Sequence, residues 1–357
     1  MQKYFKIFIN LEKAQMYLKL YLIGVIKVNK KFVINCVGDS VTEGMRMCGH
    51  HTSDYGKSSY PAQLFSVLKD NGYDNIEVNN YGHGGECFPD IVARIGGVAT
   101  FITEDLIVPD NTRVSLGKRN RIDGKNFNTK LKLCYADESG EDMCVYFTQM
   151  SHDTNPVTID GVKYIMTVSD DNENYIEKMF PDNEETVIKA GSVLFTANKR
   201  SPDVNVFYGG INDGTSFTLK KFIDLTKKCA EVNGGRYIVL GSTHAIFEKW
   251  KDIPGANKEE KYKNYRRACL ENFGIHFIDL YDEFSRHGLD ISLNGGYFRD
   301  LSEEQKEGIS QKLEQHIIPA EFAYNKTNEN DVHLSEEGYY VIATLVFERM
   351  KLLGYLN

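Results

Sequence analysis

The sequence predicts an α/β protein with three layers, in which a mostly parallel sheet lies between helices and a small all-β domain is inserted. Three observations lead to this prediction. Apolar strand-like segments alternate with helical patterns over residues 31–105 and again over 201–357, as in parallel sheets covered on both faces. Residues 106–200 instead show short strand-like segments separated by turn-forming clusters. Several predicted strands end in glycine-rich turns.

The composition is that of an ordinary globular protein. The chain has 357 residues, 41% hydrophobic and 26% charged, so we expect one large core or two smaller ones. The net charge is −8 and the lysines are scattered, which argues against nucleic acid as a partner.

The cysteines do not indicate a zinc ribbon or a disulfide framework. There are seven of them, dispersed and without a CxxC pair. Cys134 and Cys144 flank a predicted hairpin turn, but we do not expect them to form a disulfide. Cys48, His50 and His51 superficially suggest a metal site. Without further ligands we expect them to form a polar loop, and no metal.

Residues 1–30 form a short apolar and basic lead-in whose role the sequence does not reveal. Its apolar run is broken by Glu12, Lys13 and Lys19, and no small-residue cleavage site follows. We therefore expect neither a signal peptide nor a transmembrane span. The cytoplasm is the default compartment, and an extracellular or surface location stays open.

The first predicted strand, residues 32–37, ends on the turn Gly38-Asp39-Ser40. This turn leaves a serine hydroxyl at the carboxyl end of a strand, where open α/β sheets bind ligands. A helix is predicted from Pro61 to Gly72, because proline suits the first helical position and glycine the end.

A second strand, residues 76–78, leads into a glycine-rich turn that includes Gly82, Gly84 and Gly85. Glycines in such a turn let backbone N–H groups approach a ligand closely. Two such turns on neighbouring strands suggest one shared site.

The region from 106 to 200 is predicted to be an inserted β domain. Its strand-like segments are residues 113–116, 130–135, 143–147, 162–168 and 187–195. Tyrosines at positions 135, 146, 164 and 175 are candidates to line a cleft, although core packing explains them equally well.

The alternation of strands and helices then resumes. The sequence predicts strands at residues 204–208, 237–240 and 275–280, and helices at 217–232, 258–273 and 336–353. Ser302 and Gln305 form a capping box for one further helix.

Four groups of polar residues are predicted to meet at one edge of the sheet: Ser40, the 82–85 turn, Asn212, and Asp331 with His333. Each has an ordinary structural explanation, as a turn, a helix cap, a packing contact or a surface side chain. Together they supply a hydroxyl, backbone donors, an amide and an imidazole beside an acid. Acyl transfer by a serine nucleophile needs that set.

These motifs resemble the SGNH (GDSL-type) hydrolase family, whose four blocks supply Ser, Gly, Asn and His in that order. The matching stretches are GDSVTEG at 38–44, NYGHGG at 80–85, GIND at 210–213, and His333 followed by LSEEGY. The resemblance covers residues 31–103 and 203–357, and the β insertion weakly resembles one in bacterial and phage-associated members.

The resemblance implies a flavodoxin-like α/β/α fold and a serine esterase. It implies that Ser40 is the nucleophile and His333 its base. The oxyanion donors would be the N–H groups of Ser40 and Gly85 and the side-chain amide of Asn212. No metal or organic cofactor is needed for such a reaction.

One position departs from the family's Asp-x-x-His pattern. Asn330 stands three residues before His333, and Asp331 only two before it. In an extended segment, residues two apart face the same side, so we expect Asp331 to orient the imidazole. The alternative is that no carboxylate does so.

The sequence therefore predicts an esterase that removes short, acetyl-type acyl groups, with a small-molecule or glycan ester as substrate and a carbohydrate ester favoured. Two alternatives stay open: a lipid esterase or lysophospholipase, and a glycan-binding protein on a catalytically weak scaffold. The sequence does not predict the oligomeric state.

Overall fold

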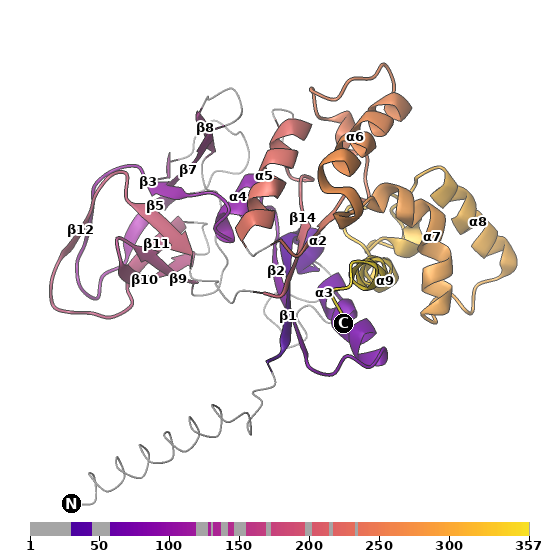
Figure 1. Cartoon of the computed structure of the whole chain (residues 1–357), viewed down its shortest axis with the longest axis horizontal. Coiled ribbons are helices and arrows are strands. Elements are labelled where there is room, and N and C mark those ends of the chain that lie inside the picture. The colour runs from indigo at the N-terminus through magenta and orange to yellow at the C-terminus, as the bar shows by residue number, and fades with distance from the viewer. Residues whose placement is uncertain are drawn as a thin grey trace, which may run out of the picture.

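The computed structural model is built around a parallel β-sheet, with antiparallel strands to one side (Figure 1). It describes residues 30–44, 58–118, 128–129, 131–136, 142–145, 155–168, 173–196, 202–213, 217–232 and 235–356. The predicted lead-in, apart from Lys30, and the Cys48–His51 group lie outside these residues.

Within the described residues, the parallel sheet has five strands. Their spatial order is β2 (Ile76–His83), β1 (Phe32–Asp39), β14 (Val204–Tyr208), β15 (Tyr237–Leu240) and β16 (Phe277–Ile278). Every neighbouring pair is parallel. Counted along the chain this order is 2-1-3-4-5, as in flavodoxin-like doubly wound sheets, where ligands bind at the β1–β14 switch point. The α/β prediction with a parallel sheet is confirmed.

Helices cover both faces of this sheet because successive strand residues point to opposite sides. Ile34 and Cys36 of β1 belong to one apolar core, whereas Val37 belongs to the other. The first core contains α3 (Tyr60–Asp70), α7 (Leu280–Asn294), α8 (Glu303–Glu314) and α9 (Glu336–Leu352). The second contains α4 (Phe88–Arg94), α5 (Leu219–Val232), η1 (Ile246–Glu248) and α6 (Lys258–Phe273).

A separate set of antiparallel strands lies on the left in Figure 1, between β2 and β14 in the chain. The described part of this region forms a nine-stranded sheet with the order β6-β5-β11-β10-β9-β13-β3-β7-β8, and β12 pairs with β4. The strands are β3 (Thr100–Ile102), β4 (Leu106–Val108), β5 (Val114–Lys118), β6 (Asn128–Thr129), β7 (Leu131–Ala136), β8 (Asp142–Val145), β9 (Asn155–Ile159), β10 (Val162–Val168), β11 (Glu173–Lys178), β12 (Thr186–Ile188) and β13 (Val193–Thr196).

This β region has its own apolar core, formed by residues such as Val157, Tyr164 and Ile176. Tyr164 is fully buried there, so at this position packing explains the ring. Cys134 and Cys144 are opposed in the β7–β8 ladder. Strand β3 precedes the boundary that the sequence suggested at residue 106, and the division into domains stays a prediction.

Local signals in the sequence were accurate where they were strong. Helix α6 has the predicted limits, and Ser302 and Gln305 form the predicted capping box at the start of α8. The strand predicted over 275–280 is mostly wrong. Residues Gly274–His276 form a 3₁₀ turn, β16 has two residues, and Leu280 already begins α7.

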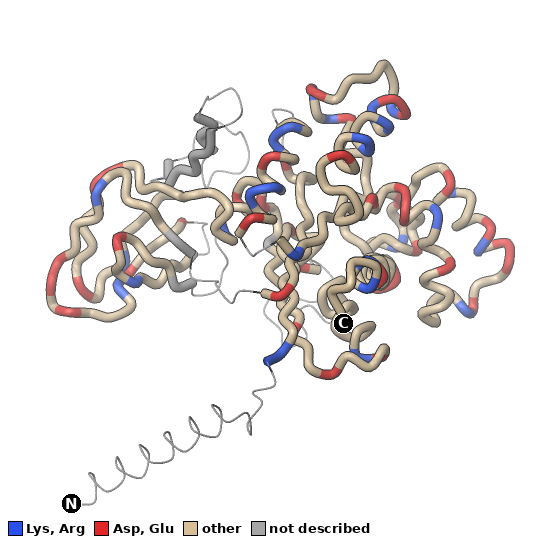
Figure 2. Tube along the Cα trace, in the orientation of Figure 1, with Lys and Arg blue, Asp and Glu red and all other residues tan. Residues whose placement is uncertain are grey.

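Charged residues of both signs are interspersed along the described backbone (Figure 2). Within that part of the chain, no helix combines the length and the apolar character needed to cross a membrane.

Candidate active site

Ser40 lies at the junction of β1 and the four-residue helix α2 (Ser40–Glu43). Asp39 caps this helix, because its Oδ1 accepts the N–H of Val41 at 2.9 Å. The Asp39 side chain is fully buried, and this burial raises its pKa to about 8. Ser40 itself is only 4% exposed, at the carboxyl end of β1.

His333 lies beside Ser40 although 293 residues separate them in the sequence. Its Nε2 is 3.0 Å from the Ser40 Oγ, which is hydrogen-bond distance. His333 precedes α9, whose cap Ser335 accepts the N–H of Gly338. A nucleophile and a base in contact are the core of serine acyl-transfer chemistry.

Asp331 is the carboxylate near the imidazole. Its Oδ1 lies 3.7 Å from the His333 Nδ1 and accepts the backbone N–H of His333 at 3.1 Å. The 3.7 Å separation is longer than a hydrogen bond, and such contacts are often loose in proteins without substrate.

Asn330 contacts Ile318 instead. Its side-chain Oδ1 accepts the Ile318 N–H at 3.0 Å, and its own N–H donates to the Ile318 carbonyl at 2.9 Å. Its φ of 57° is in the left-handed region, which asparagine tolerates better than most residues. The structure therefore brings Asp331 close to His333 and uses the Asn330 amide to hold the loop.

The second glycine-rich turn packs directly on the serine helix. A Cβ on Gly82 would lie 2.0 Å from the Glu43 nitrogen, so no larger residue fits there. Asn80 joins the two turns, since its Nδ2 donates to the Glu43 carbonyl at 3.2 Å and its Oδ1 accepts the Gly82 N–H. Gly85 has a φ of 80°, a conformation that glycine adopts without strain.

Asn212 and Asp213 follow β14 and reach the same turn. The Asn212 Nδ2 donates to the Glu86 carbonyl at 3.0 Å. A side-chain amide has two N–H groups, so this bond leaves a second donor for a ligand. The Asp213 carboxylate accepts the Phe88 N–H at 3.0 Å, and burial raises the pKa of Asp213 to about 7.

His244 also adjoins the site and is not among the residues predicted from the sequence. Its Nε2 lies 3.1 Å from the Asn330 carbonyl oxygen and its Nδ1 lies 2.8 Å from the Thr243 Oγ1. Burial lowers the pKa of His244, which favours the neutral ring. The signal was present: His244 follows the carboxyl end of β15, at the same sheet edge as Ser40.

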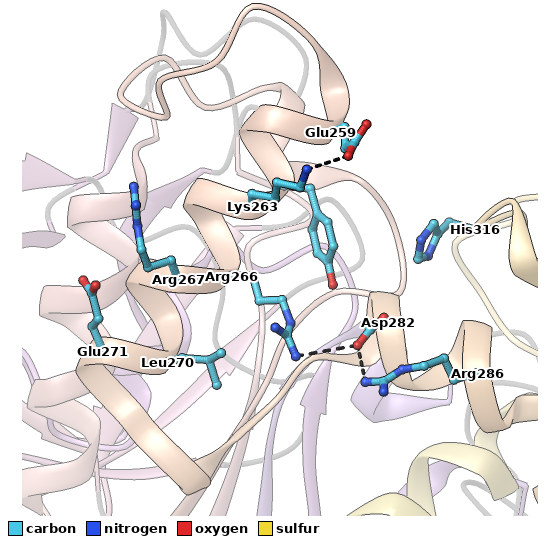
Figure 3. Close-up of a pocket in the computed structure, with 10 residues that line it drawn as sticks. Glu259, Lys263, Arg266, Arg267, Leu270, Glu271, Asp282, Arg286 and His316 are labelled. Carbon is cyan, nitrogen blue, oxygen red and sulfur yellow. Dashed lines mark hydrogen bonds and ion pairs between the residues drawn. The ribbon is translucent and has the colours of Figure 1, made fainter.

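A separate groove of about 940 Å³ lies along α6 and α7 (Figure 3). Three of its cations pair with carboxylates: Lys263 is 2.6 Å from Glu259, and both Arg266 and Arg286 pair with Asp282. None of the site residues discussed above lines it. Among the described residues, no cluster of three or more His, Cys, Asp or Glu side chains could hold a metal ion.

No family model and no curated protein matches the sequence. One solved structure is described as a peptidoglycan O-acetylesterase. Its alignment covers 91% of this chain and 92% of the other chain, at 12% sequence identity and a TM-score of 0.33. The alignment with a pyruvate kinase from Pyrobaculum aerophilum covers 81% of this chain and 74% of the kinase chain, at 8% sequence identity and a TM-score of 0.18. Such remote likenesses carry no argument, so function must be inferred from the site.

Proposed function

We propose that this protein is a serine esterase that hydrolyses short-acyl, acetyl-type esters. The observation that carries the proposal is the 3.0 Å contact between the Ser40 Oγ and the His333 Nε2. This contact lies where the strand order reverses, the usual ligand-binding position in a doubly wound sheet.

In the proposed reaction, Ser40 attacks the carbonyl carbon of the ester while its hydroxyl proton passes to the His333 Nε2. The tetrahedral intermediate then collapses, the bond to the alcohol oxygen breaks, and His333 returns the proton to that oxygen. Water repeats the sequence on the acyl-enzyme and releases the acid. Asp331 is proposed to orient His333 with its Nδ1 proton toward the carboxylate, supported by their 3.7 Å separation.

The oxyanion is proposed to be bound by the N–H groups of Ser40 and Gly85 and by the Asn212 amide. Asn212 already donates to Glu86, the residue after Gly85, which supports a common position for these donors. Loss of one such donor typically lowers kcat by about 10² to 10³-fold.

A small acyl group is favoured because Ser40 is only 4% exposed. A carbohydrate is the proposed alcohol, with the neighbouring β region as a candidate surface for it. A lipid esterase would need room for a long acyl chain beside Ser40. A glycan-binding protein without catalysis would not need the Ser40–His333 contact, which therefore favours the enzyme.

Hydrolysis of p-nitrophenyl esters by the wild type and by Ser40→Ala tests the proposal. We expect p-nitrophenyl acetate to be cleaved far faster than a long-chain ester, and Ser40→Ala to reduce kcat by at least about 10³-fold. Preference for the long chain would favour the lipid esterase. Equal rates for wild type and variant on every ester would overturn the enzyme proposal.

A further inference from the structure

Arg94, the last residue of α4, places a guanidinium beneath the proposed active site. Its side chain is 3% exposed. The Nη2 donates to the Tyr81 carbonyl at 2.8 Å and to the Gly38 carbonyl at 3.3 Å. The same guanidinium is paired with Glu86, through Nη2 at 2.8 Å and Nε at 3.2 Å.

These contacts join three segments whose relative positions matter for the proposed chemistry. Gly38 is two residues before Ser40, at the end of β1. Tyr81 and Glu86 flank the 82–85 turn, and the Glu86 carbonyl also accepts the Asn212 amide. The buried Arg94 side chain therefore contacts β1 and both ends of the 82–85 turn. Through Glu86 it is also connected to Asn212.

Stability alone is a poor explanation for this ion pair. Replacing a buried pair by apolar residues of similar size is often neutral or stabilising, because removing two charges from water is costly. The planar guanidinium has five donors in a fixed fork, which suits one carboxylate and two carbonyls at once. A lysine offers a single point charge and cannot reproduce this geometry.

The charge is also unusual in its surroundings. Asp39, Glu43, Asp90 and Asp213 are buried acids in this part of the molecule. Among the described residues outside the antiparallel β region, Arg94 is the buried base. Position and charge thus both single out this side chain.

We propose that Arg94 is a positioning residue for ester hydrolysis, which holds the Ser40 turn and the 82–85 turn so that their N–H groups face the same oxyanion. This inference rests on the proposed function. It predicts that replacing Arg94 lowers the catalytic rate even when the variant keeps the fold and the Ser40–His333 contact.

The test compares p-nitrophenyl acetate hydrolysis and thermal unfolding in four variants and the wild type. Glu86→Leu with Arg94→Met removes both charges but preserves volume, and Arg94→Lys keeps the charge without the fork. Ser40→Ala measures the rate that does not depend on the nucleophile. Lys178→Met is the matched control, because Lys178 is also buried and paired, with Asp182 at 2.6 Å, but lies in β11.

We expect the double variant to fold and to lose about 10²-fold in kcat, the size of a lost oxyanion donor, with KM within about threefold. Lys178→Met should lower the melting temperature and keep the wild-type kcat. If the double variant does not fold, Arg94→Lys decides, and it should lose at least about tenfold in kcat.

Suppose that hydrolysis by the wild type depends on Ser40, and that the folded Arg94 variants keep the wild-type kcat. This result would overturn the role of Arg94 and leave the proposed function standing. A fall in kcat for Lys178→Met equal to that of the Arg94 variants would also overturn that role, since general destabilisation would then explain both. Equal rates in the wild type and Ser40→Ala would overturn the proposed function and this inference together.

Discussion

At the residue scale, the loop before α9 determines which polar side chain lies close to His333. The left-handed backbone of Asn330 and its two bonds to Ile318 fix that residue away from the imidazole. The next residue, Asp331, then lies within 3.7 Å of the His333 Nδ1. The backbone of the loop therefore determines that Asp331, and not Asn330, lies near the imidazole.

Two single variants, Asp331→Asn and Asn330→Asp, test which of these residues acts on His333. Asp331→Asn should reduce kcat on p-nitrophenyl acetate by about 10² to 10⁴-fold, because the imidazole loses the carboxylate that is proposed to orient it. Asn330→Asp should change kcat by less than about threefold, since its oxygen can still accept the Ile318 N–H. A larger loss from Asn330→Asp than from Asp331→Asn would contradict the assignment.

Asp39 gives a prediction for the pH dependence of stability. Its pKa is raised to about 8 by burial, so between the ordinary carboxyl pKa and about pH 8 the folded state retains a proton that the unfolded chain has lost. Stability should therefore fall as pH rises through this window.

Asp39→Asn should remove that contribution, because an asparagine oxygen can still cap Val41 but does not ionise. The free energy of unfolding, measured with urea from pH 5 to 9, should fall less steeply in the variant, by up to about 1.4 kcal/mol per pH unit. Asp213, with its pKa near 7, should leave a residual slope in both proteins. Identical pH profiles for wild type and variant would contradict the prediction.

At the element scale, the end of β2 and the helix α2 form one packed unit. Gly82→Ala would place a methyl group 2.0 Å from the Glu43 nitrogen, so the two elements would have to separate. We expect a loss of at least about 2 kcal/mol in stability, together with a loss of esterase activity.

The matched control is Gly308→Ala in α8, where a Cβ meets nothing within 4 Å. It should be neutral or stabilise by up to about 1 kcal/mol, since alanine favours helix over glycine. Chemical denaturation of both variants measures the difference. A Gly82→Ala protein as stable and active as the Gly308→Ala protein would show that the contact between β2 and α2 does not matter.

The accuracy of the sequence prediction also varies by element for physical reasons. The sequence predicts α6 well because Gly274 follows its last residue, and in the structure Asn257 caps its start. It does not predict α7, whose start at Leu280 continues an apolar run that also suits a strand. Short apolar segments have no periodicity long enough to separate the two states.

At the scale of the whole molecule, the site is assembled by topology. Strands β1, β2 and β14 are neighbours in one parallel sheet, so the turns that follow them meet at its carboxyl edge. The sequence could predict this convergence, because strand ends and glycine-rich turns are local signals. It could not predict the contact of Arg94 with the Gly38 carbonyl or that of His244 with the Asn330 carbonyl, because these carbonyls are distant from the two side chains in the chain.

Covalent labelling tests whether Ser40 is a nucleophile. An organophosphonate ester that mimics the tetrahedral intermediate should modify the protein once, and peptide mass spectrometry should locate the adduct on Ser40. Labelling should be absent in Ser40→Ala and at least about tenfold slower in His333→Ala, where no base accepts the serine proton. A wild-type protein that stays unlabelled, or one labelled equally in the folded Ser40→Ala variant, would contradict the proposal that Ser40 is a nucleophile.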